Sequence, residues 1–224
     1  MRLPPQIRML HSATCGCSHR CHFSCGSCDM KHDDTFRYLL MVGLLMLVSI
    51  GVYHRFRART GEKLDRRQEG LFNMVALRLS AFAGLVGMAA YLVNPTNLSF
   101  SAVALPDSLR WAGVGLGCLT GFLLIWTLQS LGKNLTDTVV TRREHSLVTT
   151  GPYRWVRHPF YDCAALVALS VSLVSANALF LLTGGLVLLF LSRRTRVEEQ
   201  NLLNRFGEDY CKYMDHTGRF FPRL

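Results

Sequence analysis

Two short polar segments flank a long apolar stretch and carry the residues best suited to chemistry. Arg157 and His158 stand before the apolar stretch, and Glu198 and Glu199 stand after it. A guanidinium binds both oxygens of a carboxylate, and an imidazole donates or accepts a proton near neutral pH. If the apolar stretch folds back on itself, the two segments meet in a pocket with an anion-binding end and a cation-binding end. Such a pocket suits a zwitterionic ligand that carries additional positive charge.

The residue after the Arg-His pair determines how the pair is presented. Pro159 fixes its own φ angle and is well suited to the first turn of a helix. Arg157 and His158 would then lie at the N-terminal end of that helix, where free backbone N–H groups favour an anion such as a carboxylate. The sequence therefore predicts an anion-binding helix start before the apolar stretch.

The apolar stretch is too long for one ordinary membrane-spanning helix. Residues 161–191 contain no Lys or Arg, and a single helix of that length would exceed the hydrocarbon core of a bilayer. Ser175-Ala176-Asn177 lies near the middle and is suited to a turn. The pattern predicts two short helices that enter the membrane and return as a hairpin, with both polar segments at one membrane face.

The whole chain has the composition of an integral membrane protein. Its 224 residues are 50% hydrophobic and 18% charged, and the mean hydropathy is +0.20. Three more apolar runs, residues 38–53, 71–93 and 109–131, approach the length of a membrane-spanning helix. The net charge of +10 would suit a nucleic-acid-binding protein, but the basic residues lie in loops between the apolar runs. We therefore expect an all-α, multi-pass transmembrane helix bundle of about five membrane segments, including the helical hairpin, and no nucleic-acid partner.

The basic residues also predict the orientation of the bundle. Segments 54–70, 132–160 and 192–224 carry six, five and seven Lys or Arg residues, and the loop 94–108 carries none. Because such residues are enriched in cytosolic loops, we place the three basic segments, the pocket and a helical C-terminal tail in the cytosol. Basic residues before position 38 argue for the opposite orientation, which would require the hairpin to be one long span.

Two regions outside the spans have patterns of their own. Residues 137–141 and 146–149 alternate in a way that favours a small β-hairpin.

Residues 1–34 are polar and separate from the expected membrane domain, residues 35–224. Five cysteines lie in this segment with two histidines interleaved among them, at positions Cys15, Cys17, His19, Cys21, His22, Cys25 and Cys28. Such side chains suit zinc or an iron–sulfur cluster, but the odd cysteine count and the single C-x-x-C spacing favour a flexible leader, or a mis-assigned start, without a metal site.

The polar segments resemble those of a known enzyme family. The matching residues are Gly151-Pro-Tyr153-Arg-Trp-Val-Arg157-His158-Pro159-Phe-Tyr161, then Glu198-Glu199, then Phe206-Gly207-Glu-Asp-Tyr210-Cys-Lys-Tyr213. Together with Leu131-Gly132-Lys-Asn134, they make residues 131–224 similar to the isoprenylcysteine carboxyl methyltransferases, and more widely to the phospholipid N-methyltransferases. One departure is Cys163, where the family often has glycine.

This resemblance implies a membrane enzyme that transfers a methyl group from S-adenosylmethionine to a lipophilic acceptor at the cytosolic face. By position, Arg157 and His158 would be catalytic. The residues expected to contact the cofactor are Tyr153, Arg157, His158, Pro159, Tyr161, Glu198 and Glu199. The acceptor stays open between an isoprenylcysteine carboxylate, a thiol, a lipid amine and another lipophilic molecule, and the departure at Cys163 bears on the acceptor more than on the cofactor.

Other interpretations stay open beside this one. Arg157 would also suit neutralisation of a lipid phosphate, and the two acids would also suit pairing with Arg193, Arg194 and Arg196 on their own helix. At the level of the whole chain, the alternatives are a membrane oxidoreductase of the sterol-reductase type and a non-enzymatic, metal-binding membrane protein.

Overall fold

The computed structural model describes residues 21–58, 70–132 and 146–223, and within these ranges the side chains from residue 34 onward. Its contacts divide the chain into two units, Met1–Thr35 and Phe36–Leu224, and the helix bundle lies in the second. The cysteines and histidines of the leader fall outside the described side chains. The flexible leader without a metal site therefore stays a prediction, and the structure places the beginning of a helix at Cys21.

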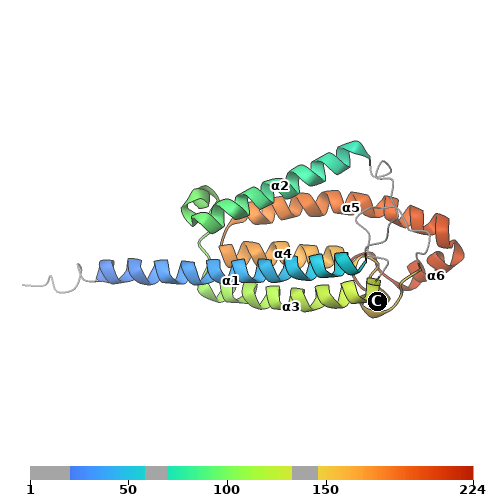
Figure 1. Ribbon diagram of the computed structural model, residues 1–224, viewed down its shortest axis with the longest axis horizontal. Helices are drawn as coiled ribbons and strands as arrows, with labels where there is room; N and C mark the ends of the chain where they lie inside the picture. Colours follow the sequence, from blue (N-terminus) through green and yellow to red (C-terminus); the bar gives the residue numbers. More distant parts are fainter. Residues whose placement is uncertain (1–20, 59–69, 133–145, 224) are drawn as a thin grey trace, which may run out of the picture. The chain divides into compact units, whose positions relative to one another are not determined.

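The part of the chain that the structure describes is helical, which confirms the expected all-α class (Figure 1). The α-helices are α1 (Cys21–Arg57), α2 (Leu71–Val93), α3 (Asp107–Leu131), α4 (Pro159–Ser175), α5 (Ala178–Phe206) and α6 (Glu208–His216). Two 3-10 helices, η2 (Pro95–Ser101) and η4 (Gly151–Arg154), lie in the connections. Residues 146–149 form no strand, and the other arm of the predicted β-hairpin, 137–141, lies outside the described residues.

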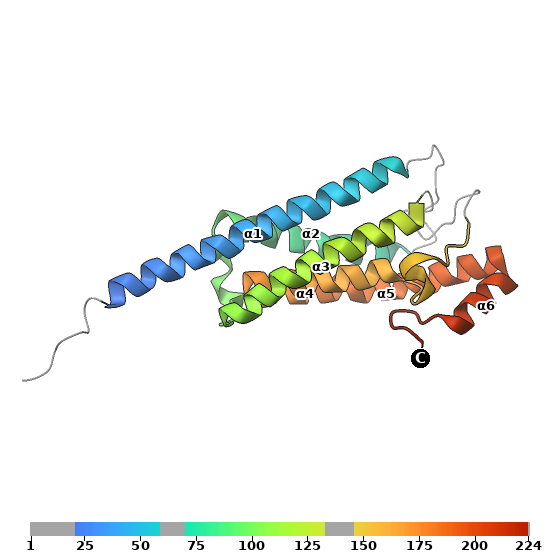
Figure 2. The ribbon, with the colours of Figure 1, turned by 90° about the horizontal axis from the view of Figure 1, so that it is seen from below.

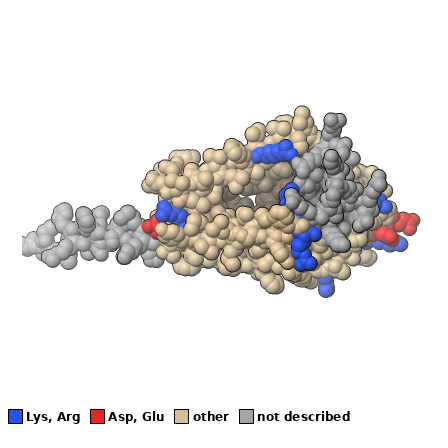
Figure 3. Space-filling model, in the orientation of Figure 1, with Lys and Arg blue, Asp and Glu red and all other residues tan. Residues whose placement is uncertain are grey.

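Four of these helices are long and apolar enough to cross a membrane: Asp34–Arg57 within α1, α2, α3 and α5. The apolar helix α4 is shorter, at 17 residues. Large apolar side chains such as Leu45, Phe82 and Phe122 are more than half exposed, as expected of surfaces that lipid covers. Charged side chains are sparse along the middle of the face seen in Figure 3. The multi-pass membrane bundle expected from the composition is confirmed.

The predicted helical hairpin is formed by α4 and α5, which turn at the expected place. Ala176 adopts a left-handed conformation with φ of 49°, and its amide donates to Leu173 O and Ser172 O, closing the C-terminal end of α4. Asn177 then begins α5, because its side-chain oxygen accepts a hydrogen bond from the amide of Leu179 at 3.0 Å. The side-chain nitrogen Nδ2 of Asn177 donates to Leu98 O at 3.0 Å and so connects the turn to η2.

The second arm of the hairpin is longer than the sequence predicted. Helix α5 continues past Leu191 to Phe206 and carries the acids with it, whereas the sequence placed a separate tail from Ser192 onward. An ion pair one helical turn apart, Arg194 Nε to Glu198 Oε1 at 3.1 Å, supports the extension. The helix ends at Gly207, whose φ of 54° suits glycine.

Helix α4 lies between α3 and α5, and α5 packs in turn against α2 (Figures 1 and 2). The main apolar core lies around the hairpin turn and combines side chains from five elements: Phe36, Leu40, Tyr91, Leu98, Val171, Val174 and Phe180. The buried Arg110 donates to Val174 O at 3.2 Å and lies 4.0 Å from the ring centre of Phe36. The opposite ends of α4 and α5 carry the polar residues.

The two arms of the hairpin approach closely at a glycine. A methyl group placed on Gly184 of α5 would lie 2.5 Å from the Cβ of Ala168 in α4, so the helices pack backbone to backbone there. The next residue, Gly185, faces open space, where an added methyl group would contact nothing within 4 Å. This close approach holds the two arms side by side.

The pair of glycines makes the packing testable. We expect Gly184→Ala to lower the melting temperature of the detergent-purified protein, because overpacking at a helix contact costs roughly 1–3 kcal/mol. The matched variant Gly185→Ala should leave the melting temperature unchanged or raise it slightly, because alanine favours a helix by about 1 kcal/mol over glycine. Equal melting temperatures for the two variants would contradict the close approach of α4 and α5.

Candidate functional site

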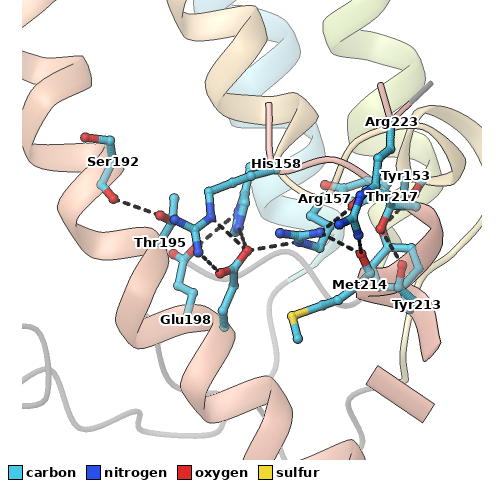
Figure 4. A network of polar contacts seen from close by, with 12 residues as sticks. Tyr153, Arg157, His158, Ser192, Thr195, Glu198, Tyr213, Met214, Thr217 and Arg223 are labelled. Atoms are coloured by element: carbon cyan, nitrogen blue, oxygen red, sulfur yellow. Dashed lines mark hydrogen bonds and ion pairs between the residues drawn. The ribbon is translucent and has the colours of Figure 1, made fainter. Parts of the chain in front are cut away.

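The hairpin brings the start of α4 and the polar part of α5 to the same end of the bundle. Pro159 is the first residue of α4, as predicted, and Tyr161 closes its first turn by donating its amide to His158 O at 2.9 Å. Glu198 and Glu199 lie on α5 beside this helix start. In Figure 4, Arg157 and His158 lie between α5 and the C-terminal residues that follow α6.

Arg157 joins the loop before α4 to both α5 and the C-terminal segment. Its Nε donates to Glu199 Oε1 at 3.0 Å, and its Nη1 donates to the carbonyl oxygens of Met214, at 3.3 Å, and Thr217 (Figure 4). The side chain is only 12% exposed. The carboxylate that Arg157 was expected to pair with is therefore supplied by the protein itself, through Glu199.

Glu199 is the most heavily paired acid of the site. Its Oε1 receives Arg157 Nε at 3.0 Å, Arg219 Nε at 3.1 Å and His158 Nε2 at 3.3 Å, and its Oε2 pairs with Arg219 Nη2. The residue is 5% exposed. Because a buried carboxylate is costly unless charged or polar donors satisfy it, these partners explain how the acid is accommodated.

Glu198 lies in a more open position and has different partners. Its Oε1 accepts a hydrogen bond from Tyr161 at 2.7 Å and from Arg194 Nε at 3.1 Å, and its Oε2 lies 3.6 Å from His158 Nδ1. Its side chain is 20% exposed, against 7% for Glu199. The imidazole of His158 therefore faces a carboxylate on each nitrogen, and its ring is stacked on that of Tyr161 at 5.5 Å.

Three tyrosines pack around this ion network. Tyr153 is buried, and burial raises the pKa of its hydroxyl far above the usual value. Its carbonyl oxygen accepts a hydrogen bond from Tyr213, at 2.6 Å, and burial raises the pKa of Tyr213 to about 12. Tyr210 is 1% exposed, and its hydroxyl has no hydrogen-bond partner among the described residues. All three tyrosines stay protonated over the physiological pH range.

A cavity of about 410 Å³ adjoins these residues and is open to the surface. Its volume falls within the range of small-molecule pockets. Both cationic and anionic side chains line it, together with hydroxyl groups: Thr149, Arg154, Asp209, Lys212, Tyr213, His216 and Thr217.

The structure therefore brings together most of the residues singled out in the sequence. Arg157, His158, Tyr161, Glu198 and Glu199 form one connected network, whereas Pro159 contributes by starting α4 and Tyr153 accepts a bond through its backbone. Their roles toward a ligand stay predictions. Cys163 is buried in α4 close to Thr127 of α3, so this departure from the family pattern falls at a helix interface.

Sequence reasoning missed the part that the C-terminal segment plays. Arg219 and the carbonyl of Thr217 contact the network, but neither residue belongs to a periodic pattern that would have revealed it. Arg194, considered only as a possible partner of the acids, does pair with Glu198. The signal that could have indicated this role was the position of Arg219 in a short polar segment near the C-terminal end of the sequence.

Comparison with known proteins points to one family. A sequence model of the isoprenylcysteine carboxyl methyltransferase family matches residues 113–204, which span α3 to α5 and both polar segments. The Protein-S-isoprenylcysteine O-methyltransferase of Saccharomyces cerevisiae is 36% identical over 114 residues, which are 48% of this chain and 48% of that protein. The cobalt-zinc-cadmium resistance protein CzcN of Cupriavidus metallidurans is 31% identical over 127 residues, 51% of this chain and 55% of that protein.

A solved structure of a eukaryotic intramembrane Ras methyltransferase, also an isoprenylcysteine carboxyl methyltransferase, is 22% identical, with a TM-score of 0.48. The match covers 66% of this chain and 51% of the chain in the solved structure. The chain spans about half the length of the curated relatives it matches. The resemblance drawn from the sequence motifs is confirmed: residues 113–204 match the isoprenylcysteine carboxyl methyltransferase family.

Proposed function

We propose that this protein is an integral membrane methyltransferase that uses S-adenosylmethionine to methylate the carboxylate of a lipophilic acceptor. The observation that carries the proposal is the convergence of Arg157 and His158 with Glu198 and Glu199 at one end of an apolar bundle. The family match covers the segments that carry these residues, and several of the similar proteins are named as O-methyltransferases. An oxygen acceptor is therefore favoured over a thiol or an amine.

The donor set at this site fits S-adenosylmethionine, whose charged groups are a sulfonium, an ammonium and a carboxylate. Glu198 is the acid suited to the ligand, because its side chain is more exposed than that of Glu199 and carries fewer cationic partners. Its carboxylate would accept hydrogen bonds from the ammonium or the ribose hydroxyls. When bound, S-adenosylmethionine supplies an electrophilic methyl group, so the protein has chiefly to align the acceptor and exclude water.

The remaining residues hold this arrangement. Glu199 is occupied by Arg157, His158 and Arg219, which makes it an internal support for the site. Both nitrogens of His158 face carboxylates, which favours an orienting role as a hydrogen-bond donor over a role as a free base. Tyr161 donates to Glu198 and stacks on His158, so it fixes both side chains at once.

The guanidinium groups at the site favour an acidic acceptor. Two of them, from Arg157 and Arg219, converge on Glu199. Guanidinium groups attract a carboxylate and disfavour a cationic amine. Among the acceptors considered, an isoprenylcysteine carboxylate combines this charge with a lipid chain that partitions into the membrane.

We also propose that the site faces the cytosol. The basic residues of segments 54–70, 132–160 and 192–224, and their absence from 94–108, support this orientation. The acceptor would then reach the site from the membrane, and S-adenosylmethionine from the aqueous cytosolic side. We further propose that residues 35–224 make up the methyltransferase domain and that residues 1–34 form a leader outside it.

Methyl transfer is the direct test. The detergent-purified full chain, incubated with radiolabelled S-adenosylmethionine and farnesylcysteine with a free carboxylate, should produce a labelled ester. Arg157→Ala should lower the rate by at least about 100-fold, because it removes a charge-assisted bond and leaves Glu199 underpaired. The methyl ester of farnesylcysteine, whose carboxylate is blocked, serves as the control acceptor. Labelling of the ester at the same rate, or of neither compound, would contradict the proposed acceptor.

The two acids should respond differently to loss of charge. We expect Glu198→Gln to weaken binding of S-adenosylmethionine roughly tenfold or more, at little cost in stability, because it removes a ligand-facing charge. Glu199→Gln should lower the melting temperature markedly, because breaking a buried ion pair costs roughly 3 kcal/mol or more. Calorimetric titration and thermal unfolding in detergent measure both effects. The division of roles is wrong if Glu198→Gln destabilises the protein as much as Glu199→Gln does.

A further inference from the structure

The segment after α6 runs along the loop that carries the Arg-His pair. The amide of Arg157 donates to Gly218 O at 2.9 Å, and the amide of His158 donates to Arg219 O at 3.1 Å. In return, the amide of Gly218 donates to Trp155 O at 3.3 Å, and Val156 and Gly218 form a parallel bridge. We call residues 217–220 the C-terminal strap, because they bind this loop through its backbone.

Three residues of the strap make further contacts that support the same connection. Thr217 is buried, and its carbonyl accepts from the guanidinium of Arg157. The ring of Phe220 lies 5.9 Å from that of His158. At Gly218, a methyl group would collide with the backbone carbonyl of Phe221, so the turn of the strap admits only glycine. The strap therefore contacts both residues of the pair from one side, while α5 contacts them from the other.

Arg219 links the strap to α5. Its Nε donates to Glu199 Oε1 at 3.1 Å and its Nη2 pairs with Oε2, so the guanidinium holds both oxygens of the carboxylate. Hydrogen bonding to Glu199 raises the pKa of Arg219 above its usual value. Because Oε1 also receives Arg157 and His158, the orientation that Arg219 imposes on the carboxylate is passed on to both.

We propose that Arg219 is a positioning residue for the methyltransferase site, acting through Glu199 to fix His158 and Arg157, with the C-terminal strap as its support. This inference rests on the proposed function for its consequence in catalysis, but the positioning itself is a property of the protein alone. The strap contributes no group to the reaction. It holds the loop before α4 in a fixed position relative to the acids of α5.

The test compares Arg219→Gln, Arg219→Lys and Arg205→Gln in the full chain. Arg205 is an exposed arginine in the last turn of α5 and serves as the charge-matched control. We expect Arg219→Gln to lower kcat about tenfold with the acceptor KM within about twofold, because one charge-assisted contact is lost away from the acceptor. Arg219→Lys should recover part of kcat, and Arg205→Gln should match the unmodified chain. An Arg219→Gln variant with unchanged kcat overturns the inference.

Combining the substitutions at Arg219 and Glu199 in one chain shows whether Arg219 acts through Glu199. In a Glu199→Gln background, Arg219→Gln should cause little further loss of kcat, because the two changes break the same contact. Independent, multiplying effects contradict positioning through Glu199. If Glu199→Gln does not fold, the partial recovery by Arg219→Lys decides instead, since a lysine that gives no recovery also contradicts the inference.

A second measurement tests the positioning role without relying on methyl transfer. Hydrogen–deuterium exchange at the amides of Arg157 and His158, both bound to the strap, should be faster in Arg219→Gln than in Arg205→Gln. Equal exchange in the two variants overturns the positioning role. Faster exchange in a protein without methyl transfer would refute the proposed function while supporting the role of the strap.

Discussion

The carboxylate of Glu199 is the interaction on which the polar end of this molecule depends. It is nearly excluded from solvent at the end of an apolar bundle, and a buried charge is unfavourable by several kcal/mol unless partners compensate it. Its partners come from the loop before α4, through Arg157 and His158, and from the strap after α6, through Arg219. Burying this one acid therefore requires three segments far apart in the sequence to converge.

The hairpin makes that convergence possible. Helix α4 has 17 residues, so at 1.5 Å per residue it carries the chain about 26 Å from His158 to the turn. Asn177 holds the turn by capping α5 and binding η2, and the close approach at Gly184 keeps the arms together. The return helix is long enough to bring Glu198 and Glu199 back beside His158. A local signal at the turn thus determines contacts at the opposite end of both helices.

Local signals explain which features could be predicted from the sequence. Pro159 marks the start of α4, Ser175-Ala176-Asn177 marks the turn, and the uniform apolar runs mark the spans. The extension of α5 to Phe206 was missed because its polar residues looked like a separate tail, although Arg194 and Glu198 pair one turn apart within it. The contacts of Arg219 were missed because pairing between the strap and residues 155–158 joins segments about 60 positions apart without any periodic pattern. Glu198 and Glu199 differ in burial and therefore in their partners. The sequence could not predict this difference, because the two residues are adjacent and of the same type.

An experimental structure of the full chain in lipid nanodiscs with S-adenosylhomocysteine, the unreactive product of the donor, tests the central claim most directly. The arrangement described above predicts that Arg157, His158 and Arg219 contact Glu199 at one membrane face, and that the bound molecule lies within hydrogen-bonding distance of Glu198. A structure that separates Arg157 from Glu199 across the bilayer, or that places the molecule away from both acids, would contradict it.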